Sequence, residues 1–94
     1  MAIWDEAKRL RNLRLHGLDF IDADEIWDEF TVTREDVREN YGERRWITFG
    51  LLRGEVVVLI HTERGEHDRY ISLRKANGYE TISYFETAGW EETQ

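Results

Sequence analysis

The residues best suited to chemistry lie in one stretch, which runs from the end of an apolar segment into the next strand-like segment. The stretch holds a histidine, a carboxylate, a tyrosine and several cations, which are His61, Glu63, Tyr70, Arg64, Arg69, Arg74 and Lys75. Cleavage of RNA by its own 2′-hydroxyl needs a base, an acid and cations that hold the phosphate as charge builds. His61 and Glu63 can exchange protons, arginines grip a phosphate at two points, and Tyr70 can stack on a base or donate a proton. The set therefore fits metal-free RNA cleavage, with no cofactor and no metal ligands.

The register of the strands decides which of these residues meet. His61 and Glu63 are two residues apart, so their side chains share one face of a strand. If Glu63 pairs with Asp68, the face of His61 also carries Tyr70, Ser72 and Arg74. If the register slips by one residue, that face instead carries Arg69, Ile71 and Lys75. The sequence leaves both registers open, and a plainer interpretation as solvated polar residues at strand ends also stands.

The remaining sequence predicts the elements that position this stretch. Residues 6–15 are predicted as a helix that begins after Asp5 and ends near Gly17. Residues 20–29 are predicted as a second helix, whose apolar stripe is Phe20, Ala23, Ile26 and Trp27. Strands are predicted at residues 30–33, 45–52, 55–62 and 69–75, with a polar loop at 34–43 and a charged turn at 63–68. A weaker helical pattern covers residues 76–88.

The order of these elements predicts the fold class. The strands follow one another without helical crossovers, which favours an α+β fold with an antiparallel meander, two N-terminal helices and a C-terminal helix. The length of 94 residues predicts a single domain over residues 1–94.

Composition limits the partners and the compartment. The formal net charge is -7, which is unusual for a nucleic-acid binder, but basic residues outnumber acidic ones between Arg44 and Lys75. Cysteine is absent, which excludes disulfides and thiolate metal sites. The longest apolar run, Val56 to Ile60, is far too short for a membrane span, and residues 1–8 contain no apolar signal region. We therefore expect a cytoplasmic protein.

Three segments of the chain resemble a known family, the BrnT ribonuclease toxins. The first is WDEAK at residues 4–8, followed by Asn12 and by HGLDF at residues 16–20. The second is RWITFGL at residues 45–51, and the third is TER at residues 62–64 with RYISLRKA at residues 69–76. The match is in the family's order from about Ile3 to Ala76.

This resemblance implies a RelE-like fold and a bacterial type II toxin–antitoxin setting. It implies an RNA substrate and a BrnA-like antitoxin partner, with a homodimer or a heterotetramer as possible assemblies. It supports phosphate or RNA contacts at Arg64, Arg69, Arg74 and Lys75, while His61 and Glu63 as proton-transfer groups rest on chemistry alone. The predicted catalytic residues are thus His61, Glu63, Arg64, Arg69 and Arg74, and the predicted RNA contacts are Lys75, Tyr70 and Arg45.

The chain departs from the resembled family at its C-terminal end. The family continues there into a basic helix, whereas no Lys or Arg follows Lys75. This difference keeps two other functions open: a catalytically inactive module that binds a protein partner, and a small interaction protein that shares only the fold.

Overall fold

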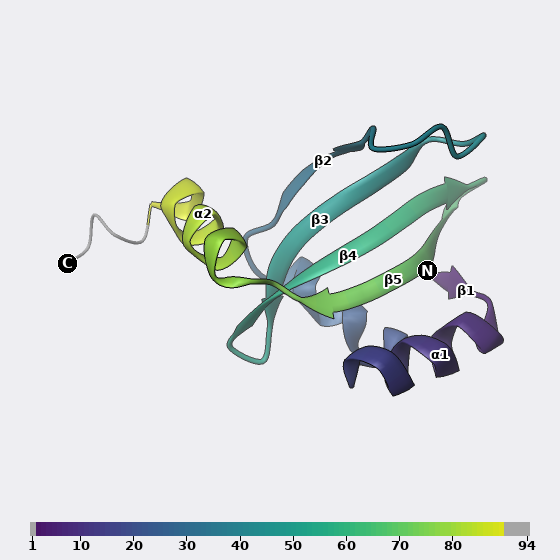
Figure 1. Ribbon diagram of the computed structural model, residues 1–94, viewed down its shortest axis with the longest axis horizontal. Coiled ribbons are helices and arrows are strands. Elements are labelled where there is room, and N and C mark those ends of the chain that lie inside the picture. The colour runs from purple at the N-terminus through teal and green to yellow at the C-terminus, as the bar shows by residue number, and fades with distance from the viewer. Residues whose placement is uncertain (1, 90–94) are drawn as a thin grey trace.

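Helix α1 begins and ends at clear capping residues. In the computed structural model, which describes residues 2–89, α1 covers Glu6–His16. The side chain of Asp5 accepts a hydrogen bond from the backbone N–H of Ala7 at 2.8 Å, as expected of an N-cap. Gly17 ends the helix with a φ of 70°, a conformation that glycine adopts without steric cost. The helix lies beside the sheet, next to strand β5 (His67–Lys75) (Figure 1).

The second helical element is η1, Phe20–Asp28, and it is a 3-10 helix. A 3-10 helix has 3.0 residues per turn, so residues three apart align on one face. Its three buried residues, Phe20, Ala23 and Ile26, have that spacing. The face packs closely on strand β3 (Arg45–Leu52): a Cβ added at Gly50 would lie 3.0 Å from the Cβ of Ile26. Gly50 therefore lets η1 approach the sheet.

The sheet has five strands in the order β1-β5-β4-β3-β2. Strands β2 (Val32–Asp36), β3, β4 (Glu55–Arg64) and β5 form the predicted antiparallel meander. The sequence did not predict β1 (Ile3–Trp4), which pairs with β5 in parallel. The mixed α+β class is confirmed, with two α-helices, one 3-10 helix and a partly mixed sheet.

Two predicted boundaries were wrong. Residues 34–36 belong to β2 and not to a loop, because they pair with β3 as far as Asp36 and Arg45. The predicted turn at residues 63–68 is much shorter, since β4 extends to Arg64 and β5 begins at His67. Gly65, with a φ of 62°, supplies the left-handed conformation that this tight turn uses.

A β-bulge in β5 changes which side chains share a face. Glu63 pairs with Asp68 and His61 pairs with Tyr70, as in the first of the two registers. Ile60 then pairs with Ser72, so Ile71 has no partner on β4. An extra residue inverts the side-chain alternation beyond it. Ser72 and Arg74 therefore do not lie on the face of His61, which corrects the prediction attached to that register.

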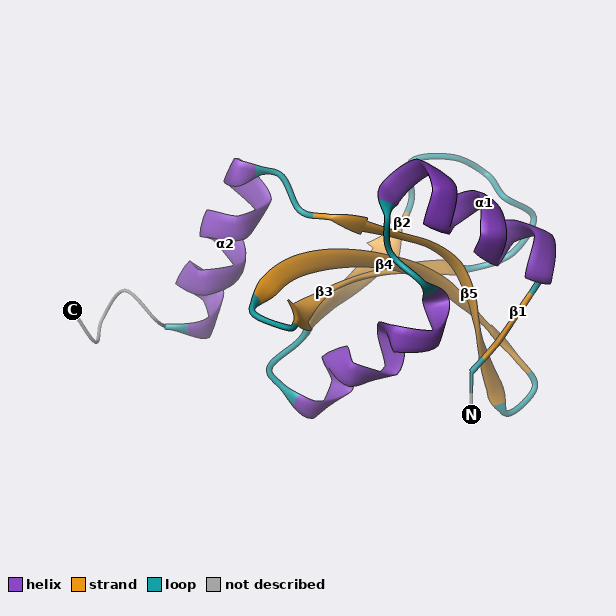
Figure 2. Cartoon of the chain, turned by 90° about the horizontal axis from the view of Figure 1, so that it is seen from below, coloured by secondary structure: helices purple, strands orange, loops and turns teal. Residues whose placement is uncertain are grey.

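The two faces of the sheet are covered differently. One face packs on η1 around Phe20, Ile26, Leu59, Tyr70 and Leu73. The other face carries a smaller apolar cluster, which contacts helix α2 (Gly78–Ala88) through Tyr84. Figure 2 shows η1 on one side of the strands and α2 near one end. We call the first face the η1 face and the second the open face.

Helix α2 is fixed by a capping box. The Asn77 side chain accepts from the backbone N–H of Glu80, and the Glu80 side chain accepts from the backbone N–H of Asn77. The Tyr84 hydroxyl donates to the Phe30 carbonyl oxygen at 2.5 Å and ties α2 to the segment before β2. Within residues 2–89, none of the helices has the length and apolar character that crossing a membrane requires.

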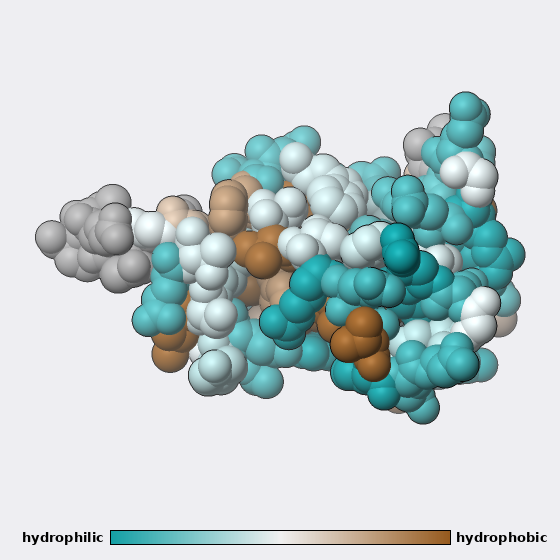
Figure 3. Space-filling view, turned by 90° about the horizontal axis from the view of Figure 1, so that it is seen from above, coloured by the Kyte–Doolittle hydropathy of each residue, from teal (hydrophilic) through white to brown (hydrophobic). Residues whose placement is uncertain are grey.

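The edge of the sheet formed by β2 is polar. Thr33, Arg34 and Glu35 are exposed along it. Seen from above, the molecule is mostly hydrophilic, and its hydrophobic residues lie in separate places near the middle of the view as well as toward α2 (Figure 3). Charged residues on an edge strand disfavour pairing with another sheet.

Candidate nucleic-acid interface

Cross-strand pairing arranges the open face in rows. One row crosses the sheet from β2 to β5 and consists of Asp36, Arg45, Thr62 and Arg69. The next row consists of Arg34, Ile47, Ile60 and Ser72, and the third of Val32, Phe49, Val58 and Arg74. Directly paired residues point to the same face of a sheet, so these arginines share one surface. The surface has apolar residues in its middle and cations around them.

This surface is hollowed into an open groove of about 480 Å³. Its apolar residues are Ile47, Phe49, Val58 and Ile60 from the two central strands, with Ile71 from β5. Its basic residues are Arg34, Arg38, Arg45 and Arg74. Its other polar residues are Asp36, Glu39, Tyr41, Ser72 and Glu80. An apolar floor beside guanidinium groups suits a ligand with flat bases and a charged backbone.

Two of the groove arginines are held by carboxylates of the groove itself. Arg38 binds Asp36 through two hydrogen bonds of 2.8 Å, and these bonds hold the pKa of Asp36 well below its usual range. Arg74 binds Glu80 through two hydrogen bonds of 2.9 Å, which lower the pKa of Glu80 to about 2. Arg34 instead lies over the ring of Phe49, 5.2 Å from its centroid. The groove thus contains guanidinium groups in fixed positions.

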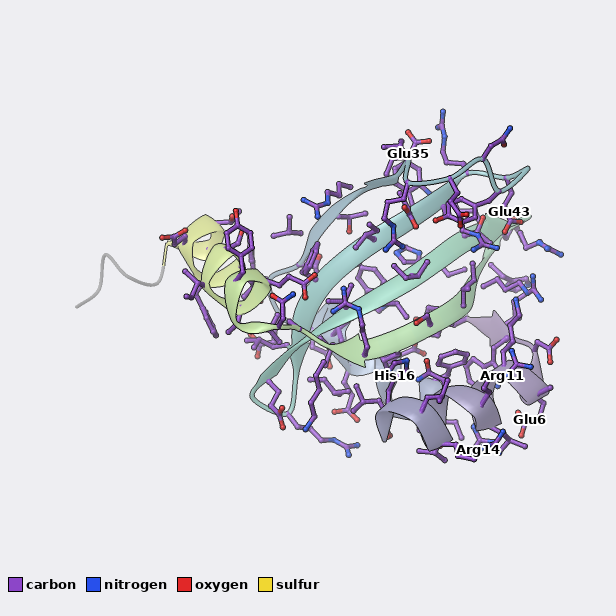
Figure 4. All side chains as sticks on the ribbon, in the orientation of Figure 1. Glu6, Arg11, Arg14, His16, Glu35 and Glu43 are labelled. Atoms are coloured by element: carbon purple, nitrogen blue, oxygen red, sulfur yellow. The ribbon has the colours of Figure 1, made fainter. Side chains whose placement is uncertain are left out.

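A second basic group lies at the hairpin end of the same face, around Glu43. Arg45 donates to the Glu43 carboxylate at 3.0 Å, and an Arg64 nitrogen lies 3.6 Å from its other oxygen. The hydrogen bond from Arg45 is the main cause that lowers the pKa of Glu43, and the charges of Arg64 and Arg69 add to it. Arg45 also lies over the Tyr41 ring, 4.2 Å from its centroid. Figure 4 places Glu43 at the end of the sheet far from α2.

His61 lies on the η1 face, away from these arginines. Its side chain is buried, with 5% of the residue exposed, and the ring of Trp27 packs on it at 5.7 Å. Its Nε2 atom is 2.7 Å from the Thr48 hydroxyl, which in turn is 2.7 Å from that of Thr33. Its Nδ1 atom has no hydrogen-bond partner among the described residues and lies 3.6 Å from an oxygen of Asp68. Burial lowers the pKa of His61, although Asp68 opposes this shift.

Tyr70 and Lys75 also lie away from the groove. Tyr70 is 1% exposed, stacks on Trp4, and donates its hydroxyl to Asp24. Burial is the main cause that raises its pKa. Lys75 pairs with Val57, a residue of the η1-face core, and its ammonium lies 3.3 Å from Glu55. A tyrosine packed in this way has no free ring face for a nucleobase.

The predicted site residues therefore divide into two groups. The structure brings together on the open face Arg45, Arg64, Arg69 and Arg74. Three others lie on the opposite η1 face: His61, Tyr70 and Lys75. Glu63 is exposed beside the hairpin, also on the η1 face. Sequence reasoning missed Arg34, Arg38, Tyr41 and Glu43, which it assigned to a polar loop. The alternation of Val32, Arg34 and Asp36 was the available signal that β2 continues.

We expect buried His61 to make the free energy of unfolding depend on pH. Its pKa in the folded protein is below the ordinary value of 6.5, so the unfolded chain takes up a proton first as pH falls. We expect this contribution to be intact above pH 6.5 and to fall by up to about 1.4 kcal/mol per pH unit below it. Urea unfolding between pH 7.5 and 5.5 measures how steeply the unfolding free energy depends on pH. Relative to wild type, we expect this slope to be weaker in His61→Gln and unchanged in His16→Gln. Equal slopes in all three proteins would contradict it.

The sequence matches the model of a known protein family over most of its length. The model of the family described as "Ribonuclease toxin, BrnT, of type II toxin-antitoxin system" matches residues 4–80. No curated protein matches the sequence. The matched range contains strands β2 to β5, the second residue of β1, and the beginning of α2 as far as Glu80.

Proposed function

Because the chain belongs to the family of BrnT ribonuclease toxins of type II toxin–antitoxin systems, we propose that it cleaves RNA without a metal ion. We further propose that the RNA lies along the open face and that Arg45, Arg64, Arg69 and Arg74 contact its phosphates. The family relation also leads us to propose a RelE-like arrangement of the sheet.

The observation that carries this proposal is that several arginines lie on the open face. Arg69 and Arg45 lie in one cross-strand row, with Arg64 beside them at the hairpin. Attack of a 2′-hydroxyl concentrates negative charge on the phosphate oxygens, and fixed guanidinium groups stabilise that charge without reorganisation.

The partner of a type II toxin is an antitoxin, and we propose one of the BrnA type. To neutralise the toxin it has to cover the open face or compete for its arginines. The carboxylates of Asp36 and Glu80 already bind two of those arginines, which indicates that an acidic segment would fit there.

The test is RNA cleavage by purified protein with excess EDTA. We expect wild-type protein to cleave a single-stranded RNA, and we expect the antitoxin to stop this cleavage. Cleavage that disappears with EDTA and returns with Mg²⁺ would contradict the metal-free proposal. Absence of cleavage by folded protein, on free RNA and on translating ribosomes, would contradict the ribonuclease proposal.

One observation favours a second candidate, an inactive module that binds a protein partner. Helix α2 has no Lys or Arg, and Glu80 occupies the guanidinium of Arg74. A protein of this kind would bind the antitoxin tightly and leave RNA intact. The same assay, combined with calorimetric titration of the antitoxin, separates the two candidates.

A further inference from the structure

We propose that Glu43 is the general base of RNA cleavage and that His67 is the general acid. This inference rests on the proposed ribonuclease function and assigns the proton transfers to the hairpin end of the open face. It replaces His61 and Glu63 in those roles.

Glu43 has the surroundings of a base that acts on a bound phosphodiester. Its carboxylate oxygens lie 3.0 Å from a nitrogen of Arg45 and 3.6 Å from a nitrogen of Arg64, and the charges of Arg45, Arg64 and Arg69 lower its pKa. Its side chain is 26% exposed, so a substrate can reach it. A 2′-hydroxyl whose phosphate sits on these guanidinium groups would lie within reach of the carboxylate.

His67 is brought to the same face by the short hairpin. It pairs directly with Arg64, and the pairs that follow are Glu63 with Asp68 and Thr62 with Arg69. Side chains alternate along the strand, so His67 and Arg64 lie on the face of Thr62 and Arg69. His67 is exposed, whereas His61 is buried under Trp27. It is therefore the histidine that shares a surface with the arginines.

The two residues complete a balanced reaction. The Glu43 carboxylate takes the proton of the ribose 2′-hydroxyl, and the 2′-oxygen forms a bond to phosphorus. The bond between phosphorus and the 5′-oxygen breaks, and the His67 imidazolium gives that oxygen its proton. The products are a 2′,3′-cyclic phosphate and a 5′-hydroxyl. Proton exchange with water then returns both side chains to their starting states.

Substrate binding prepares Glu43 for this step. In the free protein its ion pairs with Arg45 and Arg64 keep it ionised. A phosphate that takes over these guanidinium groups weakens the ion pairs, and the carboxylate becomes more basic where the 2′-hydroxyl arrives.

The test compares single-turnover cleavage of a labelled single-stranded RNA, with EDTA, across pH 4–9. The variants are Glu43→Gln and His67→Asn, and the matched controls are Glu66→Gln in the same hairpin and His16→Asn on α1. We expect each site variant to lose about 10²-fold or more in rate and each control to keep the wild-type rate. We also expect a rate that rises and then falls with pH in wild type. Glu43→Gln should lose the rising limb, and His67→Asn the falling one.

A second substrate isolates the acid. An RNA with sulfur in place of the bridging 5′-oxygen has a leaving group that needs no proton. We expect His67→Asn to cleave it at close to the wild-type rate, while Glu43→Gln stays slow. RNA binding by Glu43→Gln should be unchanged or tighter, because the variant removes a negative charge.

The outcomes separate the two levels of the proposal. If wild type cleaves RNA and Glu43→Gln keeps its rate and its rising limb, the assignment of the base is overturned and the ribonuclease function stands. If His67→Asn is not restored by the sulfur substrate, the assignment of the acid is overturned. If folded wild type cleaves no RNA, the function fails and this assignment fails with it.

Discussion

Arg69→Ala should reduce the rate of RNA cleavage by about 10²–10³-fold, the usual cost of removing one group that stabilises a developing anion. Arg69 lies on the open face opposite Thr62, and it is one of the three arginines whose charges act on Glu43. Its loss leaves part of the phosphate charge in the transition state without a partner. The measurement is the single-turnover rate, together with growth inhibition in cells that lack the antitoxin.

Two further variants show whether the geometry of Arg69 matters as well as its charge. Arg69→Lys keeps the charge but loses the planar two-point donor, so we expect a rate between those of wild type and Arg69→Ala. Arg14→Ala removes an exposed arginine from α1 and should leave the rate unchanged. An Arg69→Ala protein that folds and cleaves as fast as wild type would rule out this arginine.

Asn12→Ala should cost about 2–4 kcal/mol of unfolding free energy, because it leaves buried backbone groups without partners. Asn12 is buried on α1, where its amide nitrogen donates to the carbonyl oxygens of Leu18 and Leu73 at 3.0 and 2.8 Å. Its side-chain oxygen accepts from the backbone N–H of Leu73 at 3.0 Å. The side chain thus pairs with Leu73 as a neighbouring strand would, at a point that β1 does not reach.

Urea unfolding at neutral pH measures this cost. Asn12→Leu fills the space of the side chain but loses its hydrogen bonds. If those hydrogen bonds cause the stabilisation, Asn12→Leu should be about as destabilised as Asn12→Ala. Asn40→Ala is the control, since Asn40 is exposed and its side chain accepts from the nearby backbone N–H of Gly42. A cost below about 1 kcal/mol for Asn12→Ala would show that water replaces the lost partners.

The meander and most strand positions follow from the sequence, because β-branched runs and turn residues are local signals. The helical character of residues 20–28 was predicted, but the 3-10 form of η1 was not, because the predicted stripe also included Trp27. Strand β1 was not predictable, since two residues carry no periodicity and the pairing partner is far along the chain. The extension of β2 through Asp36 was missed because its residues are polar.

The site was harder to predict than the fold, and one residue explains why. Residue types and the resemblance to BrnT toxins predicted phosphate or RNA contacts at Arg64, Arg69, Arg74 and Lys75. Strict alternation, however, would have put His61 and Arg74 on one face, and the bulge at Ile71 puts them on opposite faces. No local signal marks Ile71 as the unpaired residue. Glu43 was missed for a related reason: its role depends on arginines from three strands.

Glu80 both holds Arg74 in the groove and caps the start of α2, and this shared role couples the two places thermodynamically. One of its oxygens accepts both from Arg74 and from the backbone N–H that begins α2. A ligand that draws Arg74 away from Glu80 alters the start of that helix, and a change in the helix alters Arg74 in return. Such coupling is reciprocal, so occupancy of the groove and order at the start of α2 have to change each other by the same free energy.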